Sequence, residues 1–366
     1  MSVRVSYKKQ FLVSILFLLA IVAVVEVVAR VIEYVTYPCS LLNSDTYKNY
    51  DYFSIKQICF DQQNLLYYEQ PILHLRPDQH SQTVNVNSLG FRGPEFIREK
   101  PETSFRIFLV GGSTAFGAGA TSDDFTIAGF LQKKFDDVKL TKKIQVVNAG
   151  ISSATSFEET YYIKHTLAQL NPDLIVIYDG FNDAQYRVLS DPVISEGGEV
   201  KKWEGFKFKN FPFYRTPWVI HDLLSAKTPH TDSSKRADED STEKIISLWK
   251  SRVEEICQIG KENGFVTLIV VQPSLMTGDK KLSEYESKYV AKTDLDFATK
   301  ATLKGMADSL KSIDSSCKTI DLSRVFDDIT EPIYTDIVHV NDHGNRIVAE
   351  KLYNITLPVI LENIKN

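Results

Sequence analysis

Cysteine is scarce in this sequence, with four residues among 366, and no two of them form a Cys-x-x-Cys pair. Cysteines so few and so scattered exclude a disulfide scaffold and a Cys-x-x-Cys metal site. An excess of positive charge is also lacking, because the formal net charge is −5. Without a basic field, nucleic acid is not an expected partner. What remains is an ordinary globular composition, 43% hydrophobic and 24% charged, which fits an enzyme or a binding protein.

Charged residues are missing over one long run near the N-terminus. Basic residues within the first nine positions lead into Phe11–Val25, which is apolar apart from Ser14, and apolar character resumes after Glu26. An apolar helix of about 20 residues crosses a bilayer, whereas the core of a signal peptide has about 7–15 residues. The sequence therefore predicts a transmembrane helix over residues 11–29.

The favoured interpretation of this helix is an uncleaved anchor. Val27–Ala29 also resembles a small-residue cleavage site, so a cleaved signal peptide stays open as the alternative. The basic flank predicts that residues 1–10 remain in the cytoplasm and that the rest of a single-pass chain is exported. Cys39 and Cys59 would then lie in an oxidising space, where a disulfide between them can form.

Beyond residue 104, short apolar runs alternate with amphipathic segments. Strands are predicted at Phe105–Val110, Ile144–Val147, Leu174–Tyr178, Phe265–Val271 and Lys318–Leu322. Helices are predicted at Phe125–Phe135, from a capping box at Thr155 or Ser156 to Asn171-Pro172, around Ile246–Cys257 up to Gly264, within Asp294–Ile313, and from Asp342 onward. Such alternation predicts an α/β domain in which helices cover both faces of a five-stranded parallel sheet.

This domain is expected to span residues 104–366, after an N-terminal extension over 37–103. Residues 184–240 interrupt the alternation with an aromatic-rich insertion that includes Trp203 and Trp218. The insertion has two interpretations, a lid or platform for substrate and a local packed core, and the sequence does not choose between them. For Cys257 and Cys317 we expect small buried hydrophobic residues.

Polar residues follow the predicted strands at their carboxyl ends, where open α/β sheets bind ligands. Ser113 follows the first strand, Gly150 the second and Asn182 the third, while Asp336 and His339 come after the fifth. Each alone has a simpler explanation, as a tight turn, a turn former or a surface loop. Their occurrence in order, each at a strand end, points to one site.

A nucleophilic hydrolysis site needs these residue types. The hydroxyl of Ser113 needs a base to take its proton, and His339 is the candidate. Asp336, three residues before His339, can hold the imidazole in the required tautomer. The oxyanion needs donors, which the N–H groups of Ser113 and Gly150 and the side-chain amide of Asn182 can supply. A glycine at 150 would let the backbone approach the substrate closely.

The same segments resemble a known family. Gly111-Gly112-Ser113-Thr114, Asn148-Ala149-Gly150, Gly180-Phe181-Asn182-Asp183 and Asp336-Ile337-Val338-His339 are similar to the four ordered blocks of SGNH/GDSL hydrolases. The resemblance covers about residues 104–357. It implies a flavodoxin-like three-layer α/β/α fold and the cleavage of esters and thioesters, including acetyl groups on carbohydrates and acyl chains of lipids.

The resemblance also assigns roles to single residues. It makes Ser113 the nucleophile and an oxyanion donor, Gly150 and Asn182 further oxyanion donors, and Asp336 and His339 the rest of a triad. The first block has Gly-Gly-Ser-Thr where the family has Gly-Asp-Ser-Leu, which leaves subfamily and substrate open. Upstream, Asn87–Gly93 resembles a segment of membrane-anchored relatives, with no role assigned.

Other kinds of site fit less well. Gly112–Gly117 has the spacing of a phosphate loop, but Ala118 stands where a lysine is needed. Asp336, His339 and His343 offer metal-binding side chains, yet no His-Glu-x-x-His pattern exists. We therefore expect no cofactor and no metal, and an ester of a small molecule, glycan or lipid as substrate. An acyltransferase that acts on a glycan with the same triad, or a catalytically silent member of the fold, remains the alternative.

Overall fold

The computed structural model describes residues 6–68, 72–187, 215–217, 219–220, 239–290 and 292–364. The chain divides into two compact units, and each is described by itself. One comprises residues 1–39 and 203–234, and the other residues 40–202 and 235–366. The second unit contains the residues that the sequence analysis singled out for chemistry.

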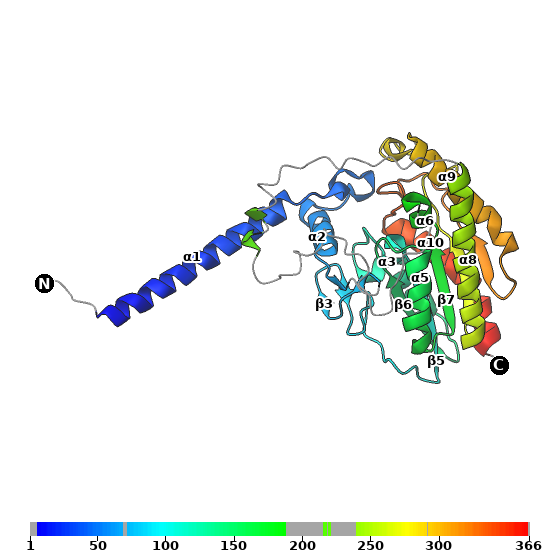
Figure 1. Ribbon diagram of the computed structural model, residues 1–366, viewed down its shortest axis with the longest axis horizontal. Helices are drawn as coiled ribbons and strands as arrows, with labels where there is room; N and C mark the ends of the chain where they lie inside the picture. Colours follow the sequence, from blue (N-terminus) through cyan, green and yellow to red (C-terminus); the bar gives the residue numbers. More distant parts are fainter. Residues whose placement is uncertain are drawn as a thin grey trace. The chain divides into compact units, whose positions relative to one another are not determined.

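A parallel sheet forms the centre of the larger unit (Figure 1). Its strands are β5 (Ser104–Gly111), β6 (Lys143–Gly150), β7 (Leu174–Asp179), β8 (Val266–Val271) and β9 (Lys318–Asp321). Their spatial order is β6-β5-β7-β8-β9, and all neighbouring pairs are parallel. Numbered along the domain, this is the order 2-1-3-4-5 of flavodoxin-like folds. The predicted fold class is confirmed.

Helices cover both faces of this sheet, because alternate side chains of each buried strand point to opposite faces. In β5, Phe108 and Val110 face one layer, while Ile107 and Leu109 face the other. The first layer contains α5 (Ser156–Tyr162), a π-helical turn (Ile163–Leu167), a 3₁₀ turn (Ala168–Leu170), α8 (Glu239–Asn263), α9 (Asp294–Ser309) and a 3₁₀ turn (Leu310–Ser312). The second layer contains α4 (Ile127–Asp136) and α10 (Asp342–Ile364). Shorter elements join them: α3 (Ser113–Phe116), α6 (Phe181–Tyr186) and 3₁₀ turns at Asp123–Phe125 and Glu286–Tyr289.

Capping side chains decide where several of these helices begin and end. The predicted capping box is present at Thr155, whose partner is Glu158, and Asn171 ends the helical stretch in a left-handed conformation with φ of 50°. The helix predicted from Phe125 begins instead at Ile127. The Thr126 side chain accepts a hydrogen bond from the Gly129 N–H, which makes Thr126 the N-cap and leaves Phe125 outside the helix.

Cys257 and Cys317 form a disulfide, so the prediction that they are simple buried hydrophobic residues was wrong. Both are buried, at 2% and 9% exposed, but α8 and the turn before β9 also bring their Cα atoms to 5.6 Å. This separation lies within the range that a disulfide requires. Periodicity along one helix predicts burial, but it does not reveal which residue lies opposite.

The free edge of β6 is covered by side chains and by one backbone contact. The Gln132 side chain accepts from the Val146 N–H at 2.7 Å and donates to the Ile144 carbonyl at 3.1 Å, as a neighbouring strand would. Further along the edge, Arg92 forms an antiparallel bridge with Asn148. These contacts satisfy backbone groups that an edge strand otherwise exposes.

The N-terminal extension from residue 40 is part of the larger unit rather than a separate body. Its elements are 3₁₀ turns at Ser40–Asn43 and Asp45–Tyr47, α2 (Tyr52–Gln63), and the antiparallel pairs β1 (Tyr67–Tyr68) with β2 (His74–Leu75) and β3 (Gln79–His80) with β4 (Asn85–Val86). Val84, Val86 and Phe116 are buried together, so the extension shares a core with the domain that follows it.

The smaller unit contains α1 (Tyr7–Thr36), the one helix in the described residues that is long and apolar enough to cross a membrane. Its Glu26 carboxylate accepts hydrogen bonds from the backbone N–H groups of Arg215 and Thr216 at 2.8 and 3.1 Å. The Arg215 side chain also pairs with Glu33 at 3.1 Å. These residues of the insertion therefore belong with α1, whereas the sequence analysis placed the insertion in the hydrolase domain. Trp203 and Trp218 lie outside the described residues.

Candidate active site

Ser113 lies at the start of α3, immediately after the carboxyl end of β5. Gly111, with φ of 155°, and Gly112 join the strand to this short helix. A Cβ at Gly111 would lie 2.3 Å from the Tyr178 carbonyl oxygen, and one at Gly112 would lie 2.4 Å from Nδ2 of Asn182. Both positions therefore require glycine for close packing, which brings Ser113 beside the ends of β7 and α6.

The structure brings Ser113, His339 and Asp336 together in one line of hydrogen bonds. Oγ of Ser113 lies 2.7 Å from Nε2 of His339, and Nδ1 of His339 lies 2.7 Å from Oδ2 of Asp336. The other carboxylate oxygen of Asp336 accepts the backbone N–H groups of Val338 and His339 at 2.9 and 2.8 Å. The structure thus brings together the three side chains that the sequence analysis singled out as Ser113, His339 and Asp336.

The electrostatics of this pair suit a base that must carry a proton transiently. Burial disfavours the charged imidazole, but the adjacent Asp336 carboxylate outweighs burial and raises the pKa of His339 above 6.5. Burial alone would raise the pKa of Asp336, yet the charge and hydrogen bonds of His339 hold it below 3.8. The two shifts have the same cause, because the charged forms of both groups stabilise each other.

A buried carboxylate holds the loop that carries this pair. Glu286 accepts the backbone N–H groups of Ile333 and Tyr334 at 2.9 and 3.1 Å. Its second oxygen accepts from Nζ of Lys280 at 2.9 Å, and the two side chains are 0% and 3% exposed. Nearby, the Tyr285 hydroxyl donates to the Thr335 carbonyl at 2.7 Å. The sequence analysis did not find Glu286, because a single glutamate in a polar segment gives no pattern.

Asn182 lies at the start of α6, beside Gly112. Its Nδ2 donates to the Ala154 carbonyl at 2.6 Å, which fixes the side chain against the turn after β6. A Cβ on Gly112 would come within 2.4 Å of the same Nδ2 and 3.5 Å of the Ala154 oxygen. An amide nitrogen carries two protons, so a second proton of Nδ2 remains for another acceptor.

The N–H of Gly150, which the sequence analysis predicts to be an oxyanion donor, has a partner within the chain. It donates to Oδ1 of Asn148 at 3.0 Å, so this donor already has a partner. A Cβ at position 150 would lie 2.1 Å from the backbone nitrogen of Phe116. Glycine is needed there because α3 packs directly on β6, not because a substrate approaches. A glycine next to a predicted strand end does not distinguish these two reasons.

The turn after Gly150 presents a different residue at the site. The Ala154 N–H donates to the Ile151 carbonyl at 3.1 Å, and Ser153 within this turn has φ of 67°. Few residues other than glycine adopt this left-handed conformation, and such positions gather at functional sites. Ser153 is exposed and lies in the turn that contacts Asn182, and no sequence signal marked it.

Behind Asn182 lie three buried carboxyl groups, Asp179, Asp183 and Glu159, and Arg252 pairs with one of them, Asp183. The Asp183 carboxylate accepts from the Ser156 N–H at 2.8 Å and from Arg252 at 3.1 Å, while Asp179 accepts from the Trp249 indole at 3.1 Å. Burial, and then the charge of Asp183, raise the pKa of Asp179. Burial and the two aspartates raise the pKa of Glu159 well above its ordinary value.

The N-terminal extension reaches the rim of the site. The Tyr47 hydroxyl donates to the Gly119 carbonyl, in the loop that follows α3. The Asp342 carboxylate, three residues after His339, accepts from the Thr121 N–H at 3.0 Å. The Tyr50 hydroxyl lies 3.5 Å from the same carboxylate. Residues far apart in sequence thus join the loop after Ser113 to the helix after His339.

Comparison with known proteins gives matches among solved structures alone. No protein-family model and no curated protein matches the chain. The acetyl xylan esterase AlAXEase is 16% identical, with 69% of this chain and 99% of that chain covered and a TM-score of 0.41. The acetylxylan esterase Axe2 from Geobacillus stearothermophilus is 14% identical, with 68% and 93% covered and a TM-score of 0.38.

A protein assigned to the G-D-S-L family of lipolytic proteins, from Desulfitobacterium hafniense, is 10% identical, with 68% and 98% covered and a TM-score of 0.39. At these TM-scores the likenesses carry no argument about activity. The interpretation of the site rests on its own geometry.

Proposed function

We propose that this chain is a serine esterase of the SGNH/GDSL kind, with Ser113 as nucleophile, His339 as base and Asp336 as the residue that orients it. The observation that supports the proposal is the continuous line of hydrogen bonds from Ser113 to Asp336, with both links at 2.7 Å. A serine hydroxyl becomes a useful nucleophile when an adjacent base takes its proton, and this geometry meets that condition.

The reaction follows from these positions. Oγ of Ser113 attacks the ester carbonyl while Nε2 of His339 takes the hydroxyl proton, and the proton then passes to the leaving alcohol. Water then attacks the acyl-enzyme while His339 takes a proton from it, the acyl–Oγ bond breaks, and His339 returns the proton to Oγ of Ser113 as the acid is released. Asp336 stabilises the imidazolium in both halves because its pKa lies below 3.8.

The oxyanion of each tetrahedral intermediate needs donors in place before it forms. We assign this role to the Ser113 N–H and to the free proton on Nδ2 of Asn182. The Gly150 N–H is replaced in this scheme, because it already donates to Asn148. The exposed Ser153 N–H is the third donor that we propose, in the turn against which Asn182 is fixed.

For substrate we propose a carbohydrate O-acyl ester or a lipid-like ester, and for location a membrane surface. The basic residues before the apolar run Phe11–Val25 favour an N-terminus in the cytoplasm and a catalytic unit on the exported side. Limited proteolysis of intact, right-side-out vesicles tests this orientation. Digestion of the catalytic unit only after the vesicles are opened would contradict it.

The test of function uses the full chain in detergent. We expect hydrolysis of p-nitrophenyl esters of increasing chain length or of acetylated polysaccharide, and loss of that activity in Ser113→Ala with its melting temperature unchanged. A second series adds a glycan acceptor, since an acyltransferase would modify the acceptor faster than it releases free acid. A folded Ser113→Ala protein that retained the wild-type rate would refute the proposal.

A further inference from the structure

The segment Asn87–Gly93, which the sequence analysis left without a role, delivers one arginine to the end of the helix that carries Ser113. The Arg92 side chain is 0% exposed. Its Nη1 donates to the carbonyl oxygens of Phe116 and Gly117 at 3.1 and 2.9 Å. The guanidinium carbon also lies 4.7 Å above the centre of the Phe116 ring. Arg92 thus contacts both the backbone and the side chain at the end of α3.

The two carbonyls that Arg92 contacts belong to the turn that fixes Ser113. Carbonyls at the end of a helix have no partner inside the helix. The N–H groups of the same two residues point back along α3, since Phe116 donates to the Gly112 carbonyl and Gly117 to the Ser113 carbonyl, both at 3.0 Å. One helical turn therefore links the guanidinium to the backbone of the nucleophile.

The remaining donors of Arg92 fix it to the surrounding structure. Nε donates to Oδ1 of Asp123 at 2.8 Å, and Nη2 donates to the Thr83 carbonyl at 3.0 Å. From the opposite side, Nδ2 of Asn148 donates to the same Phe116 carbonyl at 3.1 Å. The planar guanidinium can serve several acceptors at once because its N–H groups have fixed directions. A flexible ammonium group has no such geometry.

The rest of the segment explains why Arg92 is placed so firmly. Oδ1 of Asn87 accepts the backbone N–H groups of Leu89 and Phe91, both at 3.0 Å, and Gly90 makes the tight turn between them with φ of 85°. Phe91 is 2% exposed and packs on Phe108 of β5, with ring centres 5.7 Å apart. Each feature fixes the backbone on which Arg92 stands.

We propose that Arg92 is a positioning residue for catalysis, which holds the α3 turn so that Oγ of Ser113 stays aligned with His339. The proposal rests on the catalytic role proposed for Ser113. It assigns to Asn87–Gly93 the task of supplying this arginine. Positioning matters because a displacement of about 1 Å can lower a rate about 10²-fold.

Arg106, on strand β5, offers a matched control for Arg92. Arg106 of β5 is 0% exposed and donates to the carbonyls of Ile97, Arg98 and Leu170 at 2.7, 2.9 and 2.6 Å. Its guanidinium lies 5.0 Å above the Phe96 ring. It thus resembles Arg92 in burial and partners, but it lies near the start of β5 whereas Ser113 follows its end. Arg106→Ala should lose stability without losing rate per folded molecule.

The experiment measures how fast a fluorophosphonate probe labels Ser113 in the full chain, together with kcat and KM for p-nitrophenyl acetate. For Arg92→Ala we expect labelling and kcat to fall about 10²-fold per folded molecule, with little change in KM. In Arg92→Lys the labelling rate and kcat should fall less, because lysine keeps the positive charge but lacks the planar set of N–H donors of the guanidinium group.

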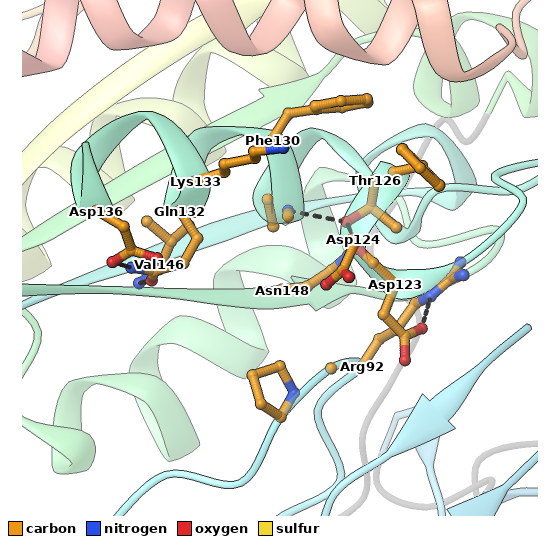
Figure 2. A pocket seen from close by; sticks show the side chains of 15 residues that line it. Arg92, Asp123, Asp124, Thr126, Phe130, Gln132, Lys133, Asp136, Val146 and Asn148 are labelled. Atoms are coloured by element: carbon orange, nitrogen blue, oxygen red, sulfur yellow. Dashed lines mark hydrogen bonds and ion pairs between the residues drawn. The ribbon is translucent and has the colours of Figure 1, made fainter.

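Chemical rescue distinguishes a positioning role of Arg92 from a role in stability alone. A cleft of about 380 Å³ is lined by Arg92, Asp123 and Asn148, and Figure 2 shows Arg92 beside Asp123 at one end of it. In Arg92→Ala the vacated space should open to this cleft, so free guanidinium at a non-denaturing concentration should restore part of the labelling rate. The same concentration of sodium chloride, and guanidinium with Arg106→Ala, should not.

The outcomes separate the two proposals. If the wild-type chain is not labelled at Ser113, the proposed function fails. If the wild type is labelled and folded Arg92→Ala is labelled equally fast, the positioning role fails and the function stands. Should Arg92→Ala not fold, Arg92→Lys decides, because a folded lysine variant with the wild-type rate also overturns the positioning role.

Discussion

The two sides of the proposed active site are held by buried ions of opposite sign. On the serine side, Arg92 donates to carbonyl groups at the end of α3. On the histidine side, Glu286 accepts N–H groups at the start of the loop that carries Asp336 and His339. In both places the ion satisfies backbone groups that regular secondary structure leaves without partners, and a cation serves carbonyls as an anion serves amides.

The two sides differ in what lies beneath the ion. Ser113 follows the carboxyl end of β5, which is the second strand in the spatial order of the sheet. The helix that begins at Ser113, α3, packs on β6. Asp336 and His339 stand in a loop between β9 and α10, and their side chains remain 39% and 24% exposed. The serine side is therefore part of the core, whereas the histidine side depends on a few loop contacts.

The largest change in kcat is expected when His339, the proposed base, is replaced. His339→Ala should lower kcat by about 10⁴-fold or more, because the serine then lacks its base. Asp336→Ala should lower it by less. Steady-state kinetics at saturating p-nitrophenyl acetate measure both changes. A small loss in folded His339→Ala would mean that another group takes the proton.

The pH dependence of kcat/KM tests the raised pKa of His339 beside Asp336. The base works when neutral, and the pKa of His339 is raised above 6.5, so the acid limb of kcat/KM should lie above pH 6.5. Asp336→Ala removes the carboxylate that raises this pKa, and the limb should move to lower pH. A limb that stayed in place would assign the titration to a different group.

The next effect concerns the loop contact itself. Glu286→Gln leaves Lys280 buried without its counter-charge, and loss of one partner of a buried pair costs about 3–5 kcal/mol of unfolding free energy. Urea unfolding measures the change. The double variant Glu286→Gln/Lys280→Met is the control, because removal of both charges should recover much of the stability. A single variant as stable as wild type would show that the loop does not depend on Glu286.

On the serine side, Asn182→Ala tests the oxyanion donors. Removal of one preorganised donor should lower kcat about 10²–10³-fold and leave KM nearly unchanged. Asn182→Asp is a useful companion, since it keeps the size but places a negative charge near the oxyanion, and it should be at least as impaired. An effect on KM alone would assign Asn182 to substrate binding instead.

The smallest effect is expected from the carboxyl groups behind Asn182. The pKa values of Glu159 and Asp179 are raised, so the folded protein binds protons that the unfolded chain has released. Their contribution to stability is complete below the unfolded pKa values and is lost as pH rises through the folded ones. The slope for each proton is at most about 1.4 kcal/mol per pH unit.

Glu159→Gln removes one of these protons from the balance, so unfolding free energy should fall less steeply with rising pH than in wild type. Urea unfolding across a pH series measures the slope. Parallel curves for Glu159→Gln and wild type would mean that Glu159 is ionised in the folded protein.

Sequence patterns predicted the serine side better than the histidine side. The five strands lie within three residues of their predicted bounds, since apolar runs between turn residues report burial directly. The strand-end rule also named Ser113 and Asn182, and the structure places Asn182 beside Gly112, the residue before Ser113. His339 and Asp336 were found as well, but the Glu286 contact that holds them depends on a neighbouring loop, which periodicity does not describe.

Two positions show what the surroundings of a residue in sequence leave out. Gly150 was predicted to be an oxyanion donor and Cys257 a buried hydrophobic residue, whereas the contacts of both depend on what lies opposite them. A backbone nitrogen of Phe116 stands where a Gly150 side chain would be, and Cys317 stands within bonding distance of Cys257. A single sequence carries little information on such pairings, which arise when distant elements pack.

The contacts along β6 affect whether this protein can associate with other chains through the edge of its sheet. An unprotected outer strand offers its backbone to any other chain, and assembly of sheets edge to edge is a common route to aggregation. Gln132 occupies two of these backbone groups with its own amide, and the Arg92 bridge occupies the strand near its end. At this edge of the sheet, residues of the same chain therefore occupy backbone groups that could otherwise pair with a strand of another copy.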